Sequence, residues 1–519
     1  MRNSLGQAIL EDRTNTSNGL LGNVTGSLEL FKGLTYRLSL SIDQSNSNNY
    51  RFTPTYFFNQ TAVGRQNFAE LNETNREFTS TLVENTLSYD TELAGGHRIN
   101  LLAGYSRQVS NGRSLGIVAR RFPSNNVRVA SAAEELASAP ASEFTSALLS
   151  SFGRVNYAFD DRYLITATIR RDGSSLFRED LRWGVFPSVA VGWNISNEAF
   201  FNQDGFINDL KLRASYGEIG SNNTNAYEID PALNLFSQYP LGEGSNQVRQ
   251  TGFSVTRGVN DAIKWETTTT TDIGLEASML DRRLTVSLDY FIKNTNDILV
   301  QLSVPRFTGF DNNVTSNAAS IRNSGFEFGA NLGDSKGDFS WNVGANFTIL
   351  KNEVTDVGGD PIVGGQFTSN GLRSTLTDVG QQIGAFYGYR VAGIYQTDAE
   401  AEADGRTDAR AGDFKFEDID GDGMLTEDDR TYIGNPIPNF EYGININLFY
   451  KSFDATLLFN GVAGNKILNA NIYRGYFDTE GNYLANAVNG WTPENPNTNI
   501  PRNTLTDQAF NRRTSDFYL

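Results

Sequence analysis

The sequence predicts an all-β fold: a large antiparallel transmembrane β-barrel of roughly fifteen strands, with short turns at one end and long loops at the other. Three observations support this prediction. Apolar side chains recur at every second position, the alternating runs are paired across short turns, and no run approaches the ~20 consecutive apolar residues of a membrane-spanning helix. A helical membrane protein is therefore excluded.

The alternation gives each predicted strand one polar and one apolar face. It is clear over residues 36–42, 210–216, 284–292 and 339–349, where Leu, Ile, Val, Phe and Tyr alternate with Ser, Asn, Thr and charged residues. Because successive side chains of a strand point to opposite faces, each of these runs has one polar face in contact with water and one apolar face.

The number of strands indicates which medium covers the apolar face. Soluble sandwiches have shorter and fewer strands, and a soluble barrel of this size would need a dry centre. We therefore expect the polar side chains inside the barrel and lipid against the apolar ones. Aromatic residues at predicted strand ends, such as Tyr36, Trp193 and Tyr450, fit the girdles of such a barrel. The alternative is that they are ordinary sheet core residues.

The connections between alternating runs are of two kinds. Short ones, including 32–33, 160–162 and 451–452, are typical of hairpin turns. Long ones, rich in Asn, Ser, Thr and Gly, include 218–264 and 396–435. We expect the short turns and the long loops to lie at opposite ends of the strands.

Composition excludes several classes of protein. The 519 residues contain no cysteine and a single histidine, His97, so disulfide scaffolds, thiolate metal sites and multi-histidine centres are impossible. A net charge of -17 gives no electrostatic reason to expect nucleic acid as a partner. Paired carboxylates such as Asp160 with Asp161 lie in predicted turns, not across a cleft, so we do not expect an enzyme.

An acidic segment, 418–429 (DIDGDGMLTEDD), has the D-x-D-x-D-G spacing of a calcium-binding loop. We therefore expect a structural Ca²⁺ within the extracellular loop 412–430. Its ligands would all be oxygen atoms, which favour Ca²⁺ over a transition metal. The predicted ligands are the carboxylates of Asp418, Asp420 and Asp422, the Met424 carbonyl, the Thr426 hydroxyl or a water it holds, and the carboxylate of Asp429. The alternative is an acidic turn that needs no metal.

Six short motifs occur in a fixed order: 170–177 (RRDGSSLF), 182–188 (RWGVFPS), 192–198 (GWNISNE), 210–217 (LKLRASYG), 325–328 (GFEF), and 412–414 (GDF) continuing through 421–423 (GDG) to 429–430 (DR). In this combination the chain, from near Asn23 to its end, resembles the SusC/RagA-like TonB-dependent outer-membrane transporters. The resemblance implies a 22-stranded barrel with short periplasmic turns and long extracellular loops. It also implies a plug, a segment that contacts TonB and a capping SusD/RagB-like surface lipoprotein.

Measured against that plan, residues 1–519 are expected to be a partial barrel domain. No plug, TonB box or signal peptide is recognised, and the last strands are expected to be missing, with a further strand beginning near 516–519. The implied function is TonB-dependent import of a large nutrient, an oligosaccharide or an oligopeptide, across the outer membrane. The alternative is a non-transporting, β-rich surface module that binds glycans.

Overall fold

A computed structural model describes most of the chain. The described residues are 4–58, 65–242, 247–256, 258–302, 304–305, 307, 314–366, 373–405, 409–477, 483–503, 511 and 513–519.

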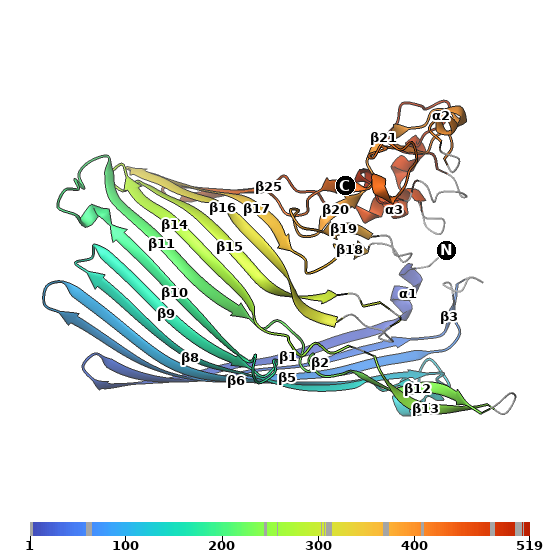
Figure 1. The fold of residues 1–519 in the computed structure, drawn as a ribbon, viewed down its shortest axis with the longest axis horizontal. Coiled ribbons are helices and arrows are strands. Elements are labelled where there is room, and N and C mark those ends of the chain that lie inside the picture. Colours follow the sequence, from blue (N-terminus) through green and yellow to red (C-terminus); the bar gives the residue numbers. More distant parts are fainter. Residues whose placement is uncertain are drawn as a thin grey trace. The chain divides into compact units, whose positions relative to one another are not determined.

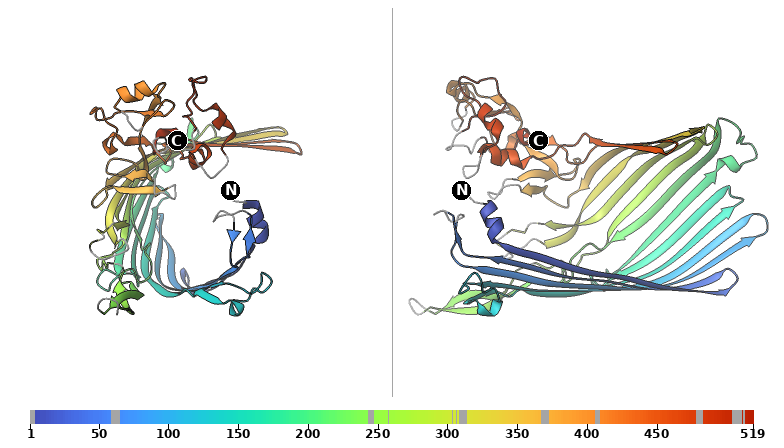
Figure 2. Two further views of the ribbon diagram at one scale, coloured as in Figure 1. Left: turned by 90° about the vertical axis from the view of Figure 1, so that its right-hand side faces the viewer. Right: turned by 180° about the vertical axis from the view of Figure 1, so that it is seen from behind.

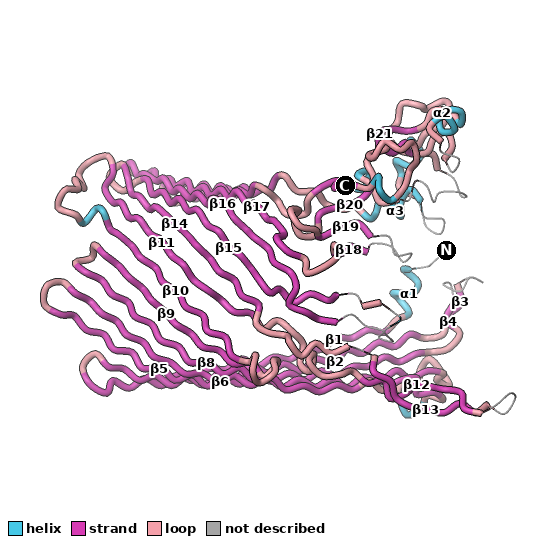
Figure 3. The backbone as a smooth tube through the Cα atoms, viewed as in Figure 1, coloured by secondary structure: helices cyan, strands magenta, loops and turns pink. Residues whose placement is uncertain are grey.

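One large antiparallel sheet of 15 strands dominates the described fold (Figures 1 and 3). Hydrogen bonding places fourteen of them in the order β1-β2-β5-β6-β8-β9-β10-β11-β14-β15-β16-β17-β24-β25, and β7 pairs with β6. Their bounds are β1 Asp12–Phe31, β2 Leu34–Thr53, β5 Glu70–Leu93, β6 His97–Arg120, β7 Glu135–Ser138, β8 Ala141–Phe159, β9 Tyr163–Ser174, β10 Trp183–Asn194, β11 Ile207–Ser221, β14 Glu266–Met279, β15 Leu284–Leu302, β16 Val314–Lys336, β17 Phe339–Asp356, β24 Phe440–Tyr450 and β25 Phe453–Ala463. The predicted all-β class and the rough number of strands are confirmed.

The smaller elements belong to the connections. Short strands form four further sheets: β3 Tyr56–Phe57 with β4 Arg65–Gln66; β12 Leu233–Leu241 with β13 Val248–Val255; β18 Ile362–Gln366, β19 Arg373–Thr377, β20 Ala385–Gly388 and β23 Thr431–Gly434; and β21 Val391–Ile394 with β22 Phe414–Phe416. The α-helices are α1 Ser4–Leu10, α2 Asp398–Ala403 and α3 Ala470–Phe477. Single-turn 3-10 helices cover Ala130–Ala132, Ile195–Asn197, Glu427–Asp429, Ala485–Asn489 and Asp516–Tyr518. None of the helices in the described part of the chain is long and apolar enough to cross a membrane.

Short and long connections alternate along the large sheet, as the sequence predicts. Two or three residues join β1 to β2, β8 to β9 and β24 to β25, whereas the return connections 222–265 and 357–439 carry whole subsidiary sheets. In the β8–β9 turn, Asp160 and Asp161 both have positive φ (55° and 54°), a conformation that aspartate tolerates and that matches the twist of a hairpin. One connection among the short ones, 195–206, is longer than expected.

By internal contacts the chain divides into two compact units. Unit 1 comprises Met1–Glu198, Arg213–Thr269 and Asp297–Asn317, and unit 2 comprises Ala199–Leu212, Thr270–Asn296 and Ala318–Leu519. The blue-to-teal strands of unit 1 form a single curved layer (Figure 2).

The faces of that layer are most regular on β9 and β10. The side chains of Ile165, Ile169, Val189 and Val191 are 43–57% exposed, although they are apolar. The register pairs them across the strands, Ile165 with Val191 and Ala167 with Val189, so that one face is uniformly apolar. The intervening positions, such as Thr166, Thr168 and Ser188, are only partly exposed. A sheet with an exposed apolar face needs a nonaqueous medium on that side. This observation supports the predicted contact with lipid.

One prediction of detail holds for only part of the sheet, and another is wrong. The alternating runs predict that many strands are near the 9–11 residues of a tilted membrane strand, which fits β24 and β25 with 11 residues each, but β5 and β6 have 24 each. At ~3.3 Å per residue such a strand is about 80 Å long, far more than a bilayer needs, and its distal part is polar, as over Asn46–Asn49 of its neighbour β2. In addition, Asp516–Tyr518 is a 3-10 helix and not the start of a strand, because Tyr518 is completely buried in an aromatic cluster of unit 2.

Candidate functional site

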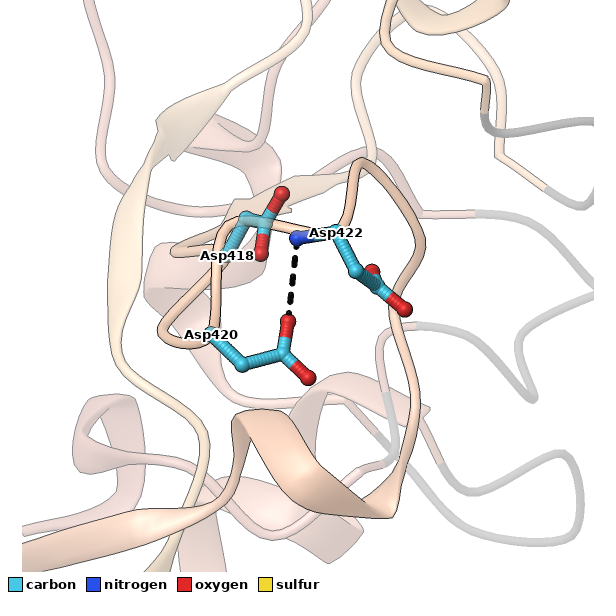
Figure 4. A group of neighbouring side chains, drawn as sticks. All are labelled: Asp418, Asp420 and Asp422. Atoms are coloured by element: carbon cyan, nitrogen blue, oxygen red, sulfur yellow. Dashed lines mark hydrogen bonds between the residues drawn. The ribbon is translucent and has the colours of Figure 1, made fainter.

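The acidic segment forms a compact loop of unit 2 between β22 and β23. Figure 4 shows Asp418, Asp420 and Asp422 gathered around one turn. Each offers a carboxylate oxygen, and these oxygens all lie within 4.8 Å of one another. All three residues are exposed. Three of the six predicted calcium ligands are thus brought together.

Hydrogen bonds from the backbone shape this turn. The two carboxylate oxygens of Asp418 accept from the amides of Gly421 and Gly423, at 2.7 and 2.8 Å. Asp422 accepts from the amide of Met424 at 2.7 Å. Gly423 has φ of +79°, a left-handed conformation that glycine adopts without strain, as expected at the sixth position of a calcium-binding loop.

Asp429 lies apart from the three clustered carboxylates. It is fully buried, and its carboxylate accepts from the amides of Ile419 and Thr426 at 2.8 and 2.7 Å. The Thr426 hydroxyl accepts from the Asp428 amide at 3.1 Å, which completes a capping box at the 3-10 helix Glu427–Asp429. Asp429 therefore ties the second residue of the loop to the ninth. Its role as a ligand, like those of the Met424 carbonyl and the Thr426 hydroxyl, stays a prediction.

The charges of the loop act on one another. The hydrogen bond from the Asp422 amide lowers the pKa of Asp420, but desolvation and the negative charges of Asp422, Asp429 and Asp418 together raise it above its ordinary value. Such mutual repulsion is what a divalent cation relieves. The donor set is made only of hard oxygens, so the residues fit Ca²⁺.

The motif Gly412-Asp413-Phe414 anchors the structure from which this loop projects. Asp413 is fully buried and binds the Arg502 guanidinium through both carboxylate oxygens, at 2.6 and 3.0 Å. It also accepts from the Asn511 side chain at 2.7 Å. Gly412 has φ of +87°, and a Cβ there would lie 2.4 Å from the Trp491 ring. The motif is thus explained by packing, not by chemistry on a ligand.

An aromatic cluster surrounds this anchor. Its fully buried members Tyr395, Phe414, Phe477 and Tyr518 come from β22, from α3 and from the segments before and after them. The cluster gives the connection 357–439 and the segment after β25 a common core, so the acidic loop is attached to a packed platform.

A second candidate site lies on the wall of unit 1. Four polar side chains form a row across four neighbouring strands: Asn100 donates to Asp90 at 2.5 Å, Asn156 donates to Asn100 at 2.9 Å, and Thr166 donates to Asn156 at 2.9 Å. All four are among the residues that line a cavity of about 1100 Å³. The row contributes hydrogen-bonding groups to a lining that also includes Lys32, Glu92 and Arg98.

The polar row and the Asp413 ion pair were not predicted as site features. The row has a sequence signal, since each member occupies a polar position of an alternating strand, but the register that aligns the four strands is set by pairing. Arg502 and Asn511 lie 89 and 98 residues from Asp413 in the chain, and no local pattern links them.

Comparisons with known proteins agree with this architecture. Residues 3–439 match the family described as TonB dependent receptor-like, beta-barrel. TonB-dependent receptor P26 of Formosa agariphila is 34% identical over 90% of this chain and 47% of its own length. TonB-dependent receptor SusC of Bacteroides thetaiotaomicron is 33% identical over 59% of this chain and 30% of its own. The chain spans about half the length of the Formosa relatives that it matches.

Among solved structures, the RagAB peptide transporter superimposes with a TM-score of 0.79 and 22% identity, over 96% of this chain and 53% of that one. This likeness shows a shared fold. The predicted resemblance to the SusC/RagA-like group and the predicted outer-membrane location are thereby confirmed. The chain belongs to the TonB-dependent receptor-like β-barrel family, whose members are outer-membrane receptors and not enzymes.

Proposed function

We propose that this chain forms the barrel wall of a receptor that imports an oligosaccharide or an oligopeptide across the outer membrane. Import is driven by TonB, and a SusD/RagB-like surface lipoprotein captures the cargo together with the extracellular loops. The single observation that carries this proposal is the family match over residues 3–439. The exposed apolar face of β9 and β10 supports it, because a water-soluble glycan-binding module would bury those side chains.

One similar structure supports the peptide class of cargo. The structure with a TM-score of 0.79 is described as a peptide transporter. Long loops carried by rigid strands suit the capture of extended cargo of either kind.

We further propose that the acidic loop holds a structural Ca²⁺ through Asp418, Asp420 and Asp422, with Met424, Thr426 and Asp429 completing the ligand set. The ion would neutralise the clustered carboxylates and stiffen the loop on its aromatic platform. It would take no part in chemistry.

Uptake by intact cells tests the transport proposal. A strain that lacks the receptor gene is compared with the same strain carrying the wild-type gene, using fluorescent oligosaccharides and fluorescent oligopeptides. We expect the wild-type gene to restore uptake of one class, and a strain without TonB to lose it. Uptake of a monosaccharide and of a free amino acid serves as the control. Restored uptake that persists without TonB would contradict the proposal.

A further inference from the structure

An arginine lies at the end of the apolar face of β9. Arg171 shares this face with Ile165 and Ile169, because residues two apart along a strand point to the same side. Arg171 is exposed, and its side chain has no hydrogen bond or ion pair with any residue that the structure describes. The preceding Arg170, on the polar face, instead binds both carboxylate oxygens of Asp172 at 2.8 Å. Because an unpaired charge on a lipid-facing surface is costly, the counter-charge of Arg171 has to come from outside the described chain.

The Trp183 ring of β10 restrains the Arg171 guanidinium. The guanidinium carbon lies 4.3 Å from the centroid of this ring, and Trp183 is 42% exposed. Gly173 of β9 makes room for the ring, since a Cβ there would lie 2.6 Å from one of its atoms. Stacking on a ring holds a guanidinium in place without using its N–H donors, which stay available for an anion.

Trp183 also indicates the depth at which this cation lies. It begins β10, at the end of the strand away from the short turn 160–162, and tryptophan is enriched where hydrocarbon meets the lipid head groups. The register pairs Arg171 with Val185, so its Cα lies two residues, or ~7 Å along the strand, inside that boundary. The contact with the Trp183 ring shows that the side chain reaches back toward the boundary. A long cationic side chain at such a depth brings its charge to the head groups in this way.

A second arginine lies at the same level two strands away. One row of paired residues crosses β6, β8, β9 and β10 and contains Arg107, Leu149, Gly173 and Trp183. Arg107 is exposed and, within the described residues, has no side-chain partner. At ~4.8 Å per strand and ~3.3 Å per residue, its Cα is about 12 Å from that of Arg171. Two long side chains at this separation can reach one head group.

Acidic side chains are distant on this face of β5, β6, β8, β9 and β10, five strands that lie wholly within the described residues. The nearest on the exterior positions are Glu77 and Glu143, which the register places beside Arg113. Arg113 is six residues from Arg107, or ~20 Å along β6. The surface around Arg107 and Arg171 is therefore a local cationic patch at the edge of an apolar face.

We propose that Arg171 and Arg107 bind the phosphate of a membrane lipid in the leaflet next to the long loops. Guanidinium groups recognise phosphate through paired, charge-assisted N–H···O bonds. The acyl chains of the same lipid lie against the apolar face, where Ile169 and Val185 are 57% and 50% exposed. This proposal concerns the lipid around the barrel wall and does not depend on what the receptor imports.

Native mass spectrometry of the full-length receptor in detergent tests the proposal. The probes are dilauroyl phosphatidic acid and dilauroylglycerol, which has the same chains without the phosphate. We expect phosphatidic acid to bind at least about tenfold more tightly, because two arginines near the head groups attract its charge. Inorganic phosphate, which has the charge without the chains, should not displace the lipid at an equal concentration.

Variants locate the site. Arg171→Gln and Arg107→Gln should each weaken the binding of phosphatidic acid at least about fivefold and leave that of dilauroylglycerol unchanged. Arg154→Gln is the matched control. Arg154 is an exposed arginine on the polar face of β8 without a side-chain partner in the described part of the chain, so its replacement removes the same charge from the opposite face. Heat-modifiable migration on gels checks that each variant is folded.

Equal affinity for phosphatidic acid and dilauroylglycerol would overturn the proposal, as would displacement of the lipid by an equal concentration of inorganic phosphate. An equal loss of affinity in Arg154→Gln and Arg171→Gln would also overturn it, because the effect would then come from net charge and not from this site. The comparison of probes on the wild-type receptor needs no variant and so does not depend on how a variant folds.

Discussion

An arginine on the apolar face of β10 should destabilise the protein, whereas an arginine on the polar face should not. The difference in stability tests whether the two faces meet lipid and water, respectively. Val189 is 44% exposed on the apolar face, between Trp183 and Trp193, which lie on the same face. The two tryptophans are ten residues apart, or ~33 Å along the strand. At the ~40° tilt of barrel strands this is a height of about 25 Å, which equals the apolar band of such barrels.

On this geometry Val189 lies one residue from the midpoint of the band, so Val189→Arg places a guanidinium near the bilayer midplane. The expected loss of stability is ~2–4 kcal/mol. The matched change is Ser188→Arg, one position away on the opposite face. Ser188 is next to Gly217, which has no side chain there, so the new side chain has room and meets water. Its expected cost is below ~1 kcal/mol.

The assay is urea unfolding of the full-length receptor in lipid vesicles, followed by heat-modifiable migration on gels. Wild type, Val189→Arg and Ser188→Arg are compared at the same lipid composition. A cost for Ser188→Arg equal to or greater than that for Val189→Arg would refute the assignment of the two faces.

Three further predictions concern unit 2. Asp413→Ala removes the carboxylate of a buried ion pair and should destabilise the loop platform by about 3 kcal/mol, seen as a lower thermal midpoint and faster limited proteolysis. Asp420→Asn should weaken Ca²⁺ binding at least about tenfold by calorimetry, whereas Asp428→Asn, at a position that is not a predicted ligand, should not; equal effects would count against the ligand set. Burial and the hydrogen bond to Asp378 raise the pKa of Tyr432 to about 12, so the stabilisation from its protonated phenol is complete below pH 10 and is lost as the pH rises through 12. The alkaline absorbance titration of the wild type minus that of Tyr432→Phe should show an ionisation near pH 12. An ionisation near pH 10 would contradict this prediction.

The wall of the barrel is predictable from sequence because its physics is local. A period of two decides which side chains share a face, and short polar turns decide which strands pair, so the β9–β10 hairpin and its apolar face follow from residues 163–194 alone. The acidic loop is equally local: Asp418 to Asp422 come together because glycine permits the turn between them.

The platform of unit 2 was not predictable in the same way. Tyr518 and Asp413 are buried by partners from distant segments, and Tyr518 lies in a sequence that reads as the start of a strand. There the tertiary contacts override the local preference for extended backbone.

The single-layer sheet of unit 1 has an evolutionary consequence. Side chains on its polar face are not interlocked with an opposing layer, so exchanging one hydrogen-bonding group for another there disturbs little beyond its immediate neighbours. Diversification of what passes along this surface can therefore proceed by single substitutions, while the backbone ladder and the greasy exterior remain as they are. A β-sheet with this separation of its two faces can change its ligand specificity without a change of fold.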